Sequence, residues 1–276
     1  MRPNPVILDA FGVDGPASRL AGGQGTAWRA GNLVLKPLDM PQEGLEWLDR
    51  VVRPRIRRDG LRVGLPARSR SGALLVDGWT AFEYLDGVHE AARWHEIADV
   101  AREFSALLAG VQHPAFIGAR TDAWSRADRF AWGEEDLANA LAAAVPAVAQ
   151  LLSLRASVDG EPGIVHADLT GNVLFAANAR PGVIDLSLYW RPTNYAIAII
   201  AVDAVCFEGA PLSLLETIST ERDFAQYLVR ALLFRMTTDW LNDAPVAASA
   251  GYDHAVAQVV ALLGRRRFRR NAGERL

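Results

Sequence analysis

Cysteine, lysine and long apolar runs are scarce in this sequence, and the scarcity of cysteine and of apolar runs each argues against a class of protein. The single cysteine, Cys206, cannot form an intramolecular disulfide, which favours a reducing compartment over a secreted, disulfide-stabilised scaffold. The most apolar run, residues 195–207, contains Asp203 and is too short to span a bilayer. No signal-type apolar stretch follows Met1. We therefore expect a cytoplasmic protein with no membrane partner.

The overall charge is also modest. The chain has 276 residues, half of them hydrophobic, and a formal net charge of −3. Such a chain can bury a large core in one domain or two lobes, and its charge predicts no nucleic-acid partner. The arginine-rich segment 265–270 is more typical of a solvated helix end than of a binding site. Monomer and homodimer both remain open.

The chain has 29 lysine and arginine residues in total. Only Lys36 is a lysine, and all the others are arginines. An ammonium is a compact point charge that a planar guanidinium does not replace between phosphates. Lys36 ends the strand-like run 33–35 and follows a turn-rich segment with Gly22, Gly23 and Gly25. A glycine-rich loop before a strand that ends in lysine is the arrangement that covers ATP in kinases.

A second motif runs from His166 to Asn172 and includes Asp168, and Asp185 follows shortly after. Phosphoryl transfer needs one carboxylate to orient the attacking hydroxyl, and an amide and a second carboxylate to hold magnesium. Apolar residues flank both polar clusters. This pattern predicts a hairpin with functional side chains at its mouth.

The hydrophobic pattern divides the chain into a β-rich first part and a helical second part. Strands are predicted at 33–35, 61–65, 74–76 and 79–85, with one helix at 43–52. After the linker-like Asp86-Gly87, helices are predicted at 95–111, 134–154, 195–207, 221–241 and 254–263.

With these residues in place, the chain resembles the aminoglycoside phosphotransferase/choline kinase-like superfamily from about residue 18 to about residue 205. The segments 77–81 and 189–192 are similar to a bacterial branch without an agreed substrate. The resemblance implies an α+β, bilobal, protein-kinase-like fold. Residues 1–87 would form a small antiparallel β-rich nucleotide-binding lobe with one helix. Residues 88–276 would form a larger, mostly helical catalytic and substrate lobe that carries the catalytic hairpin.

The resemblance assigns a role to each polar residue of the second motif. Asp168 would be the catalytic base, and Asn172 and Asp185 would hold magnesium. His166 would brace the loop by hydrogen bonding. Only three residues separate Asp168 from Asn172, one fewer than in the family's motif. Gly171 can adopt backbone angles that would still direct the Asn172 side chain toward the metal.

The first lobe would bind the nucleotide. Backbone amides at Gly22, Gly23 and Gly25 would approach its phosphates. Lys36 would pair with the phosphates and with a helical glutamate, either Glu43 or Glu46, of which we favour Glu46. Backbone groups of Glu83 and Leu85 would hold the adenine edge, so GTP is not excluded as an alternative to ATP.

The acceptor would be a small molecule with a hydroxyl group: a sugar, an amino alcohol, an aminoglycoside-like compound or another metabolite. Trp190 could stack on it and Arg191 could bind a polar or anionic group, although packing within the lobe explains both residues equally well. The sequence thus predicts an ATP- and magnesium-dependent phosphotransferase. The alternative is a non-catalytic nucleotide-binding pseudokinase or scaffold, for which the short Asp168–Asn172 loop is the best evidence.

Overall fold

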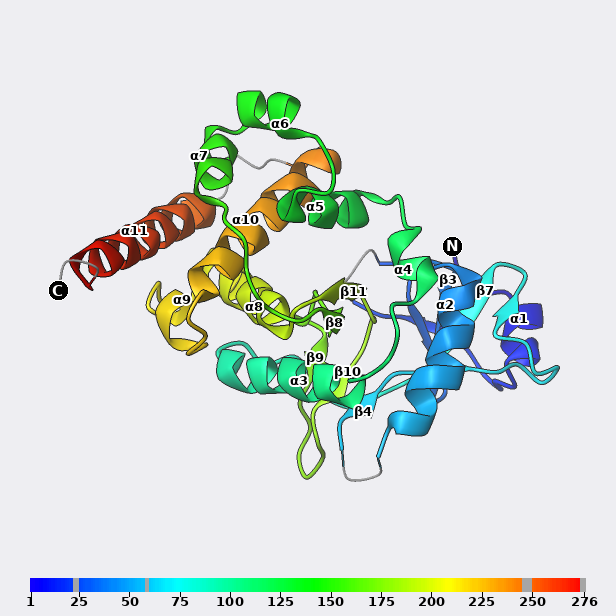
Figure 1. Cartoon of the computed structure of the whole chain (residues 1–276). Coiled ribbons are helices and arrows are strands. Elements are labelled where there is room, and N and C mark those ends of the chain that lie inside the picture. Colours follow the sequence, from blue (N-terminus) through cyan, green and yellow to red (C-terminus); the bar gives the residue numbers. More distant parts are fainter. Residues whose placement is uncertain (22–24, 58–59, 245–249, 274–276) are drawn as a thin grey trace. The chain divides into compact units, whose positions relative to one another are not determined.

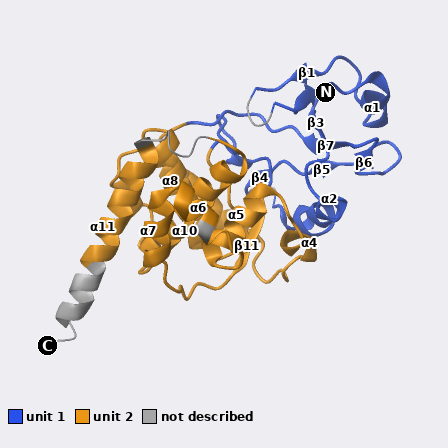
Figure 2. Ribbon diagram, turned by 90° about the horizontal axis from the view of Figure 1, so that it is seen from above, with its two compact units in different colours: residues 1–90, 171–186 blue, residues 91–170, 187–276 orange. Residues whose placement is uncertain are grey.

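The computed structural model describes residues 1–21, 25–57, 60–244 and 250–273 (Figure 1). The chain divides into two compact units, coloured in Figure 2. Unit 1 comprises residues 1–90 and 171–186, and unit 2 comprises residues 91–170 and 187–276. The first boundary lies three residues beyond the predicted one. Segment 171–186, predicted to belong to the C-terminal lobe, clusters instead with unit 1.

Unit 1 is built on an antiparallel sheet with the strand order β1-β2-β3-β7-β5, and β6 pairs with β7. Its strands are β1 (Ser18–Arg19), β2 (Trp28–Ala30), β3 (Leu33–Pro37), β5 (Pro66–Ala67), β6 (Leu75–Val76) and β7 (Trp79–Glu83). Alternation along β3 buries Leu33 and Leu35 on one face and turns Val34 and Lys36 to the other. The predicted β-rich unit is thereby confirmed, with shorter strands.

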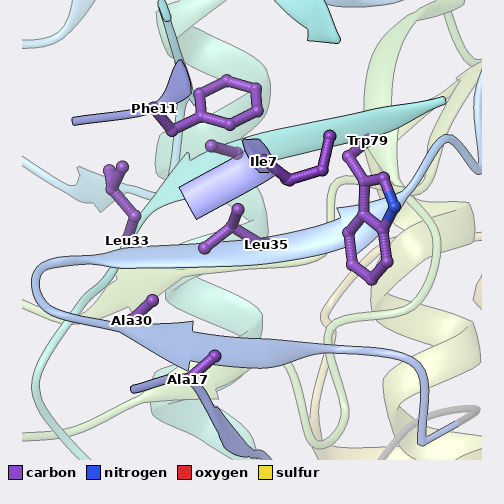
Figure 3. Packing of buried hydrophobic residues seen from close by; sticks show 8 residues of the cluster. Ile7, Phe11, Ala17, Ala30, Leu33, Leu35 and Trp79 are labelled. Atoms are coloured by element: carbon purple, nitrogen blue, oxygen red, sulfur yellow. The ribbon is translucent and has the colours of Figure 1, made fainter. Parts of the chain in front are cut away.

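A short helix, α1 (Pro5–Ala10), completes one face of this sheet. The Asn4 side chain caps it by accepting a hydrogen bond from the Ile7 amide at 3.0 Å, and Pro5 occupies the first turn. Ile7 and Phe11 pack with Leu35 and Trp79 in a buried cluster (Figure 3). This helix was not predicted from the sequence.

The predicted helix after β3 is present as α2 (Gln42–Trp47), which continues as a π-helical turn over Leu48–Val52 and a 3-10 turn over Arg53–Arg55. Its buried apolar side chains are Leu45, Trp47, Leu48 and Val52. Pro54 lacks the amide hydrogen that further helix would need, and the extended Ile56 ends the segment.

Segment 171–186 adds a second, smaller sheet to unit 1. Strands β9 (Val173–Leu174) and β10 (Gly182–Val183) form an antiparallel hairpin, and β4 (Arg62–Val63) runs parallel to β10. Because β4 lies in the first part of the chain, this parallel pairing explains why the hairpin clusters with unit 1.

Unit 2 is mostly helical. Its helices are α3 (Trp94–Leu107), α4 (Ala115–Gly118), α5 (Ala123–Trp132), α6 (Ala138–Ala144), α7 (Pro146–Leu154), α8 (Thr193–Phe207), α9 (Leu214–Thr217), α10 (Phe224–Leu241) and α11 (Ala250–Gly273). Helix α8 is buried nearly all round and contacts α3, α10 and α11, as its uniformly apolar sequence predicts. No helix in the described ranges is long and apolar enough to cross a membrane.

Two further predictions are corrected. The predicted helix 134–154 is split into α6 and α7, because Val145 is extended ahead of Pro146 and the helix must restart there. The predicted single hairpin is two ladders: β8 (Gly163–His166) pairs with β11 (Leu188–Arg191), whereas β9 pairs with β10.

Candidate active site

Lys36 lies near the end of β3 and forms two ion pairs. Its Nζ is 2.6 Å from Asp39 Oδ2 and 2.8 Å from Asp185 Oδ1. The same nitrogen lies 4.9 Å from the centroid of the Phe82 ring. The side chain is only 12% exposed, so the ammonium is held in a fixed place.

The electrostatics of Lys36 favour its charged form. Burial acts to lower the pKa of Lys36, but attraction from Asp39 and Asp185 outweighs it, so the pKa is raised above its usual value. The Lys36 ammonium therefore stays charged at neutral pH.

The prediction that Glu46 or Glu43 pairs with Lys36 is wrong for this structure. Both glutamates are exposed on α2, and Glu46 accepts a hydrogen bond from Gln42 at 3.3 Å. Asp39 takes the predicted role instead, because it lies three residues beyond Lys36 where the chain leaves β3.

The mouth of the β9–β10 hairpin brings Asn172 and Asp185 to the same end of a ladder. The Ile184 amide donates to the Asn172 carbonyl at 3.1 Å, so Asn172 lies opposite the residue before Asp185. Gly171 has φ +84°, the left-handed backbone that the shortened loop was expected to need. Asp185 itself has φ +50°, a conformation that aspartate tolerates better than most residues and that is enriched at functional sites.

The residues at this mouth suit magnesium. In the described ranges, no group of three or more His, Cys, Asp or Glu side chains could hold a metal ion by itself. Magnesium takes one or two carboxylates and completes its shell with water and phosphate oxygens. The oxygen donors of Asp185 and Asn172 fit an ion held jointly with a nucleotide, and they do not fit a closed structural metal site.

Of the predicted glycine-rich loop, Gly25 is described, whereas Gly22 and Gly23 lie outside the described residues. Gly25 has φ +66°, and its carbonyl accepts a hydrogen bond from Arg19 Nε at 2.9 Å. The loop lies between the paired strands β1 and β2, neither of which was predicted from the sequence.

The predicted adenine-binding segment follows β7. The Glu83 amide donates to the Leu65 carbonyl at 2.9 Å, and the Glu83 carboxylate accepts from Arg53 Nη1 at 2.6 Å. Within the described residues, the Leu85 amide donates to no protein acceptor. The Leu85 amide is therefore available for the predicted contact with a base edge.

In unit 2, Asp168 lies two residues beyond the end of β8. Its amide donates to His166 Nδ1 at 3.2 Å, which confirms that His166 braces this loop. His166 is 1% exposed, and its ring meets the Phe104 ring edge-on at 6.0 Å.

Asp168 has a partner that the sequence did not reveal. Arg235 on α10 donates from Nη2 to Asp168 Oδ1 at 2.7 Å and also pairs with Asp203 on α8. These residues lie 67 and 32 positions from Arg235, and neither pairing has a local sequence signal.

Trp190 and Arg191 do not share a face. They are successive residues of β11, so their side chains point to opposite sides of the ladder. Trp190 stacks on the His113 ring with centroids 4.9 Å apart. Joint binding of one acceptor by these two side chains is thus excluded by the alternation of the strand.

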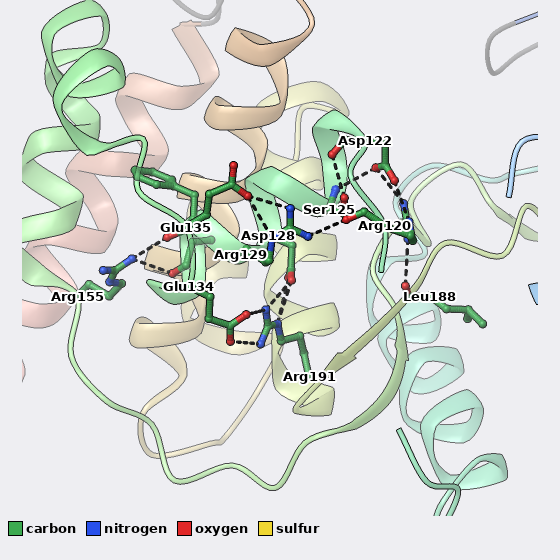
Figure 4. A network of polar contacts seen from close by, with 12 residues as sticks. Arg120, Asp122, Ser125, Asp128, Arg129, Glu134, Glu135, Arg155, Leu188 and Arg191 are labelled. Atoms are coloured by element: carbon green, nitrogen blue, oxygen red, sulfur yellow. Dashed lines mark hydrogen bonds and ion pairs between the residues drawn. The ribbon is translucent and has the colours of Figure 1, made fainter. Parts of the chain in front are cut away.

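Arg191 is held within unit 2 by two acids (Figure 4). It donates to Asp128 Oδ2 at 2.7 Å and to Glu134 Oε1 at 2.7 Å. Burial acts to lower the pKa of Arg191, but Glu134 and Asp128 raise it overall. Burial raises the pKa of Asp128, and Arg191 opposes that shift. Arg191 therefore has a structural role, in which it links Asp128 and Glu134. This corrects its predicted role in binding an anionic or polar group of the acceptor.

Neither protein-family models nor curated protein sequences match this chain. Solved structures do match it. A choline kinase from Streptococcus pneumoniae superposes with a TM-score of 0.59 at 12% identity, over 93% of this chain and 96% of that one. A spectinomycin phosphotransferase in complex with ADP and spectinomycin gives a TM-score of 0.56 at 12% identity, again over 93% and 96%.

An aminoglycoside phosphotransferase from Alicyclobacillus acidocaldarius gives a TM-score of 0.56 at 14% identity, over 99% of this chain and 97% of that one. At such low identities the similarity establishes the fold alone. The chain has the α+β protein-kinase-like fold of aminoglycoside phosphotransferases and choline kinases, which confirms the fold expected from the sequence.

Proposed function

We propose that this chain is an ATP- and magnesium-dependent phosphotransferase that moves the γ-phosphate to a hydroxyl group of a small molecule. The observation that carries the proposal is the 2.8 Å contact between Lys36 and Asp185, two residues that are 149 positions apart and that the chemistry of phosphoryl transfer requires together.

Each residue has a defined task in this proposal. Lys36 steadies the nucleotide phosphates, and the Gly25 loop supplies backbone amides to them. Asp185 and Asn172 would hold magnesium, which supplies positive charge to the phosphate oxygens as charge develops there. Asp168 orients the acceptor hydroxyl and accepts its proton. Positioning and electrostatic stabilisation supply most of the rate.

The acceptor is proposed only as a class. The neighbours of known structure include a choline kinase and a spectinomycin phosphotransferase, which are named for different small molecules. Arg191 is neutralised by Asp128 and Glu134, which removes the best candidate for binding an anionic acceptor. A neutral or cationic hydroxyl compound therefore fits better than an anionic one.

Thermal unfolding tests the nucleotide half of the proposal. A ligand at about 100 times its dissociation constant stabilises the native state by about 2.7 kcal/mol. ATP with magnesium should raise the Tm clearly more than ATP with a chelator. GTP with magnesium tests base selectivity, because backbone recognition at Glu83 and Leu85 need not exclude guanine. The absence of any nucleotide effect at millimolar concentration would contradict the proposal and favour the scaffold alternative.

A further inference from the structure

Arg235 links two carboxylates that come from different parts of unit 2. Its Nε and Nη2 donate to Asp203 Oδ1 and Oδ2 at 2.7 and 2.5 Å, and Nη2 also donates to Asp168 Oδ1 at 2.7 Å. Two parallel hydrogen bonds to one carboxylate fix the plane of a guanidinium. The orientation of Arg235 is therefore set by Asp203.

The three side chains of this network become more exposed from Asp203 through Arg235 to Asp168. The side chain of Asp203 is 5% exposed, that of Arg235 is 12% exposed, and that of Asp168 is 42% exposed. Arg235 is thus held by the buried Asp203 and also donates a hydrogen bond to the more exposed carboxylate of Asp168. Burial acts to lower the pKa of Arg235, but Asp203 and Asp168 raise it well above its usual value, so the charge is permanent.

Both oxygens of Asp203 already accept hydrogen bonds from the Arg235 guanidinium. Asp203 alone would therefore be enough to pair the buried charge of Arg235, and the contact with Asp168 is additional. The additional bond goes to the loop after β8, where the His166 ring also holds the Asp168 amide. One residue is therefore fixed at its backbone by His166 and at its carboxylate by Arg235.

We propose that Arg235 is a positioning residue that, through its contact with Oδ1, holds the Asp168 carboxylate in the orientation in which it receives the proton of the acceptor hydroxyl. This inference rests on the proposed function. A displacement of about 1 Å in such a group can lower turnover by about 100-fold without changing the binding of the other substrate.

The test measures phosphate release from magnesium-ATP, with water as the acceptor, together with the dissociation constant of magnesium-ATP from thermal unfolding. In Arg235→Gln, turnover should fall by about 10- to 100-fold while the dissociation constant changes by less than about twofold. Arg235→Lys keeps the charge and should recover part of the loss. Arg230→Gln is the matched control, because Arg230 lies on the same helix and is 5% exposed. It should retain turnover.

A buried Asp203 without its partner could prevent folding, so the paired variant Arg235→Met with Asp203→Leu removes both charges together. A folded paired variant with wild-type turnover overturns the inference, as does an equal loss in Arg230→Gln. Wild-type protein that neither binds nor turns over ATP overturns the proposed function and the inference with it. Wild-type turnover that Arg235→Gln leaves unchanged overturns the inference alone.

Discussion

Lys36 Nζ lies 2.8 Å from Asp185 Oδ1, and both belong to unit 1. The strand β3 supplies the lysine and the end of the β9–β10 hairpin supplies the aspartate. The cation proposed for the phosphates and the carboxylate proposed for magnesium thus lie in contact, with Asn172 at the same hairpin end.

The first prediction concerns Asp185. Asp185→Asn should abolish the extra stabilisation that magnesium gives to the ATP complex, because the amide is a weaker magnesium ligand than the carboxylate. Asparagine is the suitable replacement, since it tolerates the φ of +50° at this position. The measurement is the Tm with ATP in magnesium and in chelator.

Asp39→Asn is the control for that experiment, because Asp39 contacts the same ammonium at 2.6 Å and has no assigned magnesium role. It should keep the magnesium effect. Equal losses in the two variants would mean that the effect arises from the charge balance at Lys36 and not from metal binding.

The second prediction concerns the short loop. Gly171→Ala introduces a side chain at φ +84° and should cost about 1 kcal/mol of stability while weakening the magnesium effect through Asn172. Gly72→Ala carries the same strain at φ +85°, and neither position has a neighbour within 4 Å of the added carbon. Chemical denaturation should show similar stability losses, with the magnesium effect reduced only in Gly171→Ala.

The third prediction tests whether the ion pairs of Arg191 stabilise the protein. Arg191→Met leaves Asp128, which is 7% exposed, without its cation and should destabilise the protein by about 3–5 kcal/mol. Arg102→Met breaks an ion pair with side chains 45% and 76% exposed and should cost about 0–1 kcal/mol. Urea unfolding checks both values, and equal small losses would contradict the structural role.

The fourth prediction concerns pH. Burial raises the pKa of Asp203 from 3.8 to about 6, despite the opposing effect of Arg235. The native state therefore binds this proton more tightly than the unfolded state. The resulting stability is fully present below about pH 4 and is lost as pH rises through about 6.

Asp203→Asn removes this titration, so the Tm of the variant minus that of the wild type should increase from pH 4 to pH 7. The lost contact with Arg235 adds an offset to this difference but does not reverse its pH trend. Asp99→Asn, at a side chain 76% exposed, serves as the control. A difference that stays constant across this range would refute the assigned pKa shift.

The sequence predicted the parts of the fold that local patterns encode. An apolar run predicted β3, helical spacing predicted α3, and the two polar motifs predicted a hairpin with Asn172 and Asp185 at its mouth. The split between α6 and α7 was also readable, because Pro146 restricts the residue before it.

Contacts between distant segments could not be read in the same way. The parallel pairing of β4 with β10, and the linking of Asp168 to Asp203 by Arg235, depend on tertiary packing that leaves no periodic signal. Asp39 was missed for a different reason. The expected helical glutamates came from the resemblance, whereas the nearest acid in the chain makes the pair.

The most direct test of the phosphotransferase assignment compares wild type with Asp168→Asn. Both proteins are given ATP labelled in its γ-phosphate, magnesium and a panel of small hydroxyl compounds that includes choline, spectinomycin and simple sugars. We expect the wild type to label at least one acceptor, and Asp168→Asn to bind magnesium-ATP normally but to transfer no label. Transfer by Asp168→Asn at the wild-type rate would show that Asp168 is not the catalytic base.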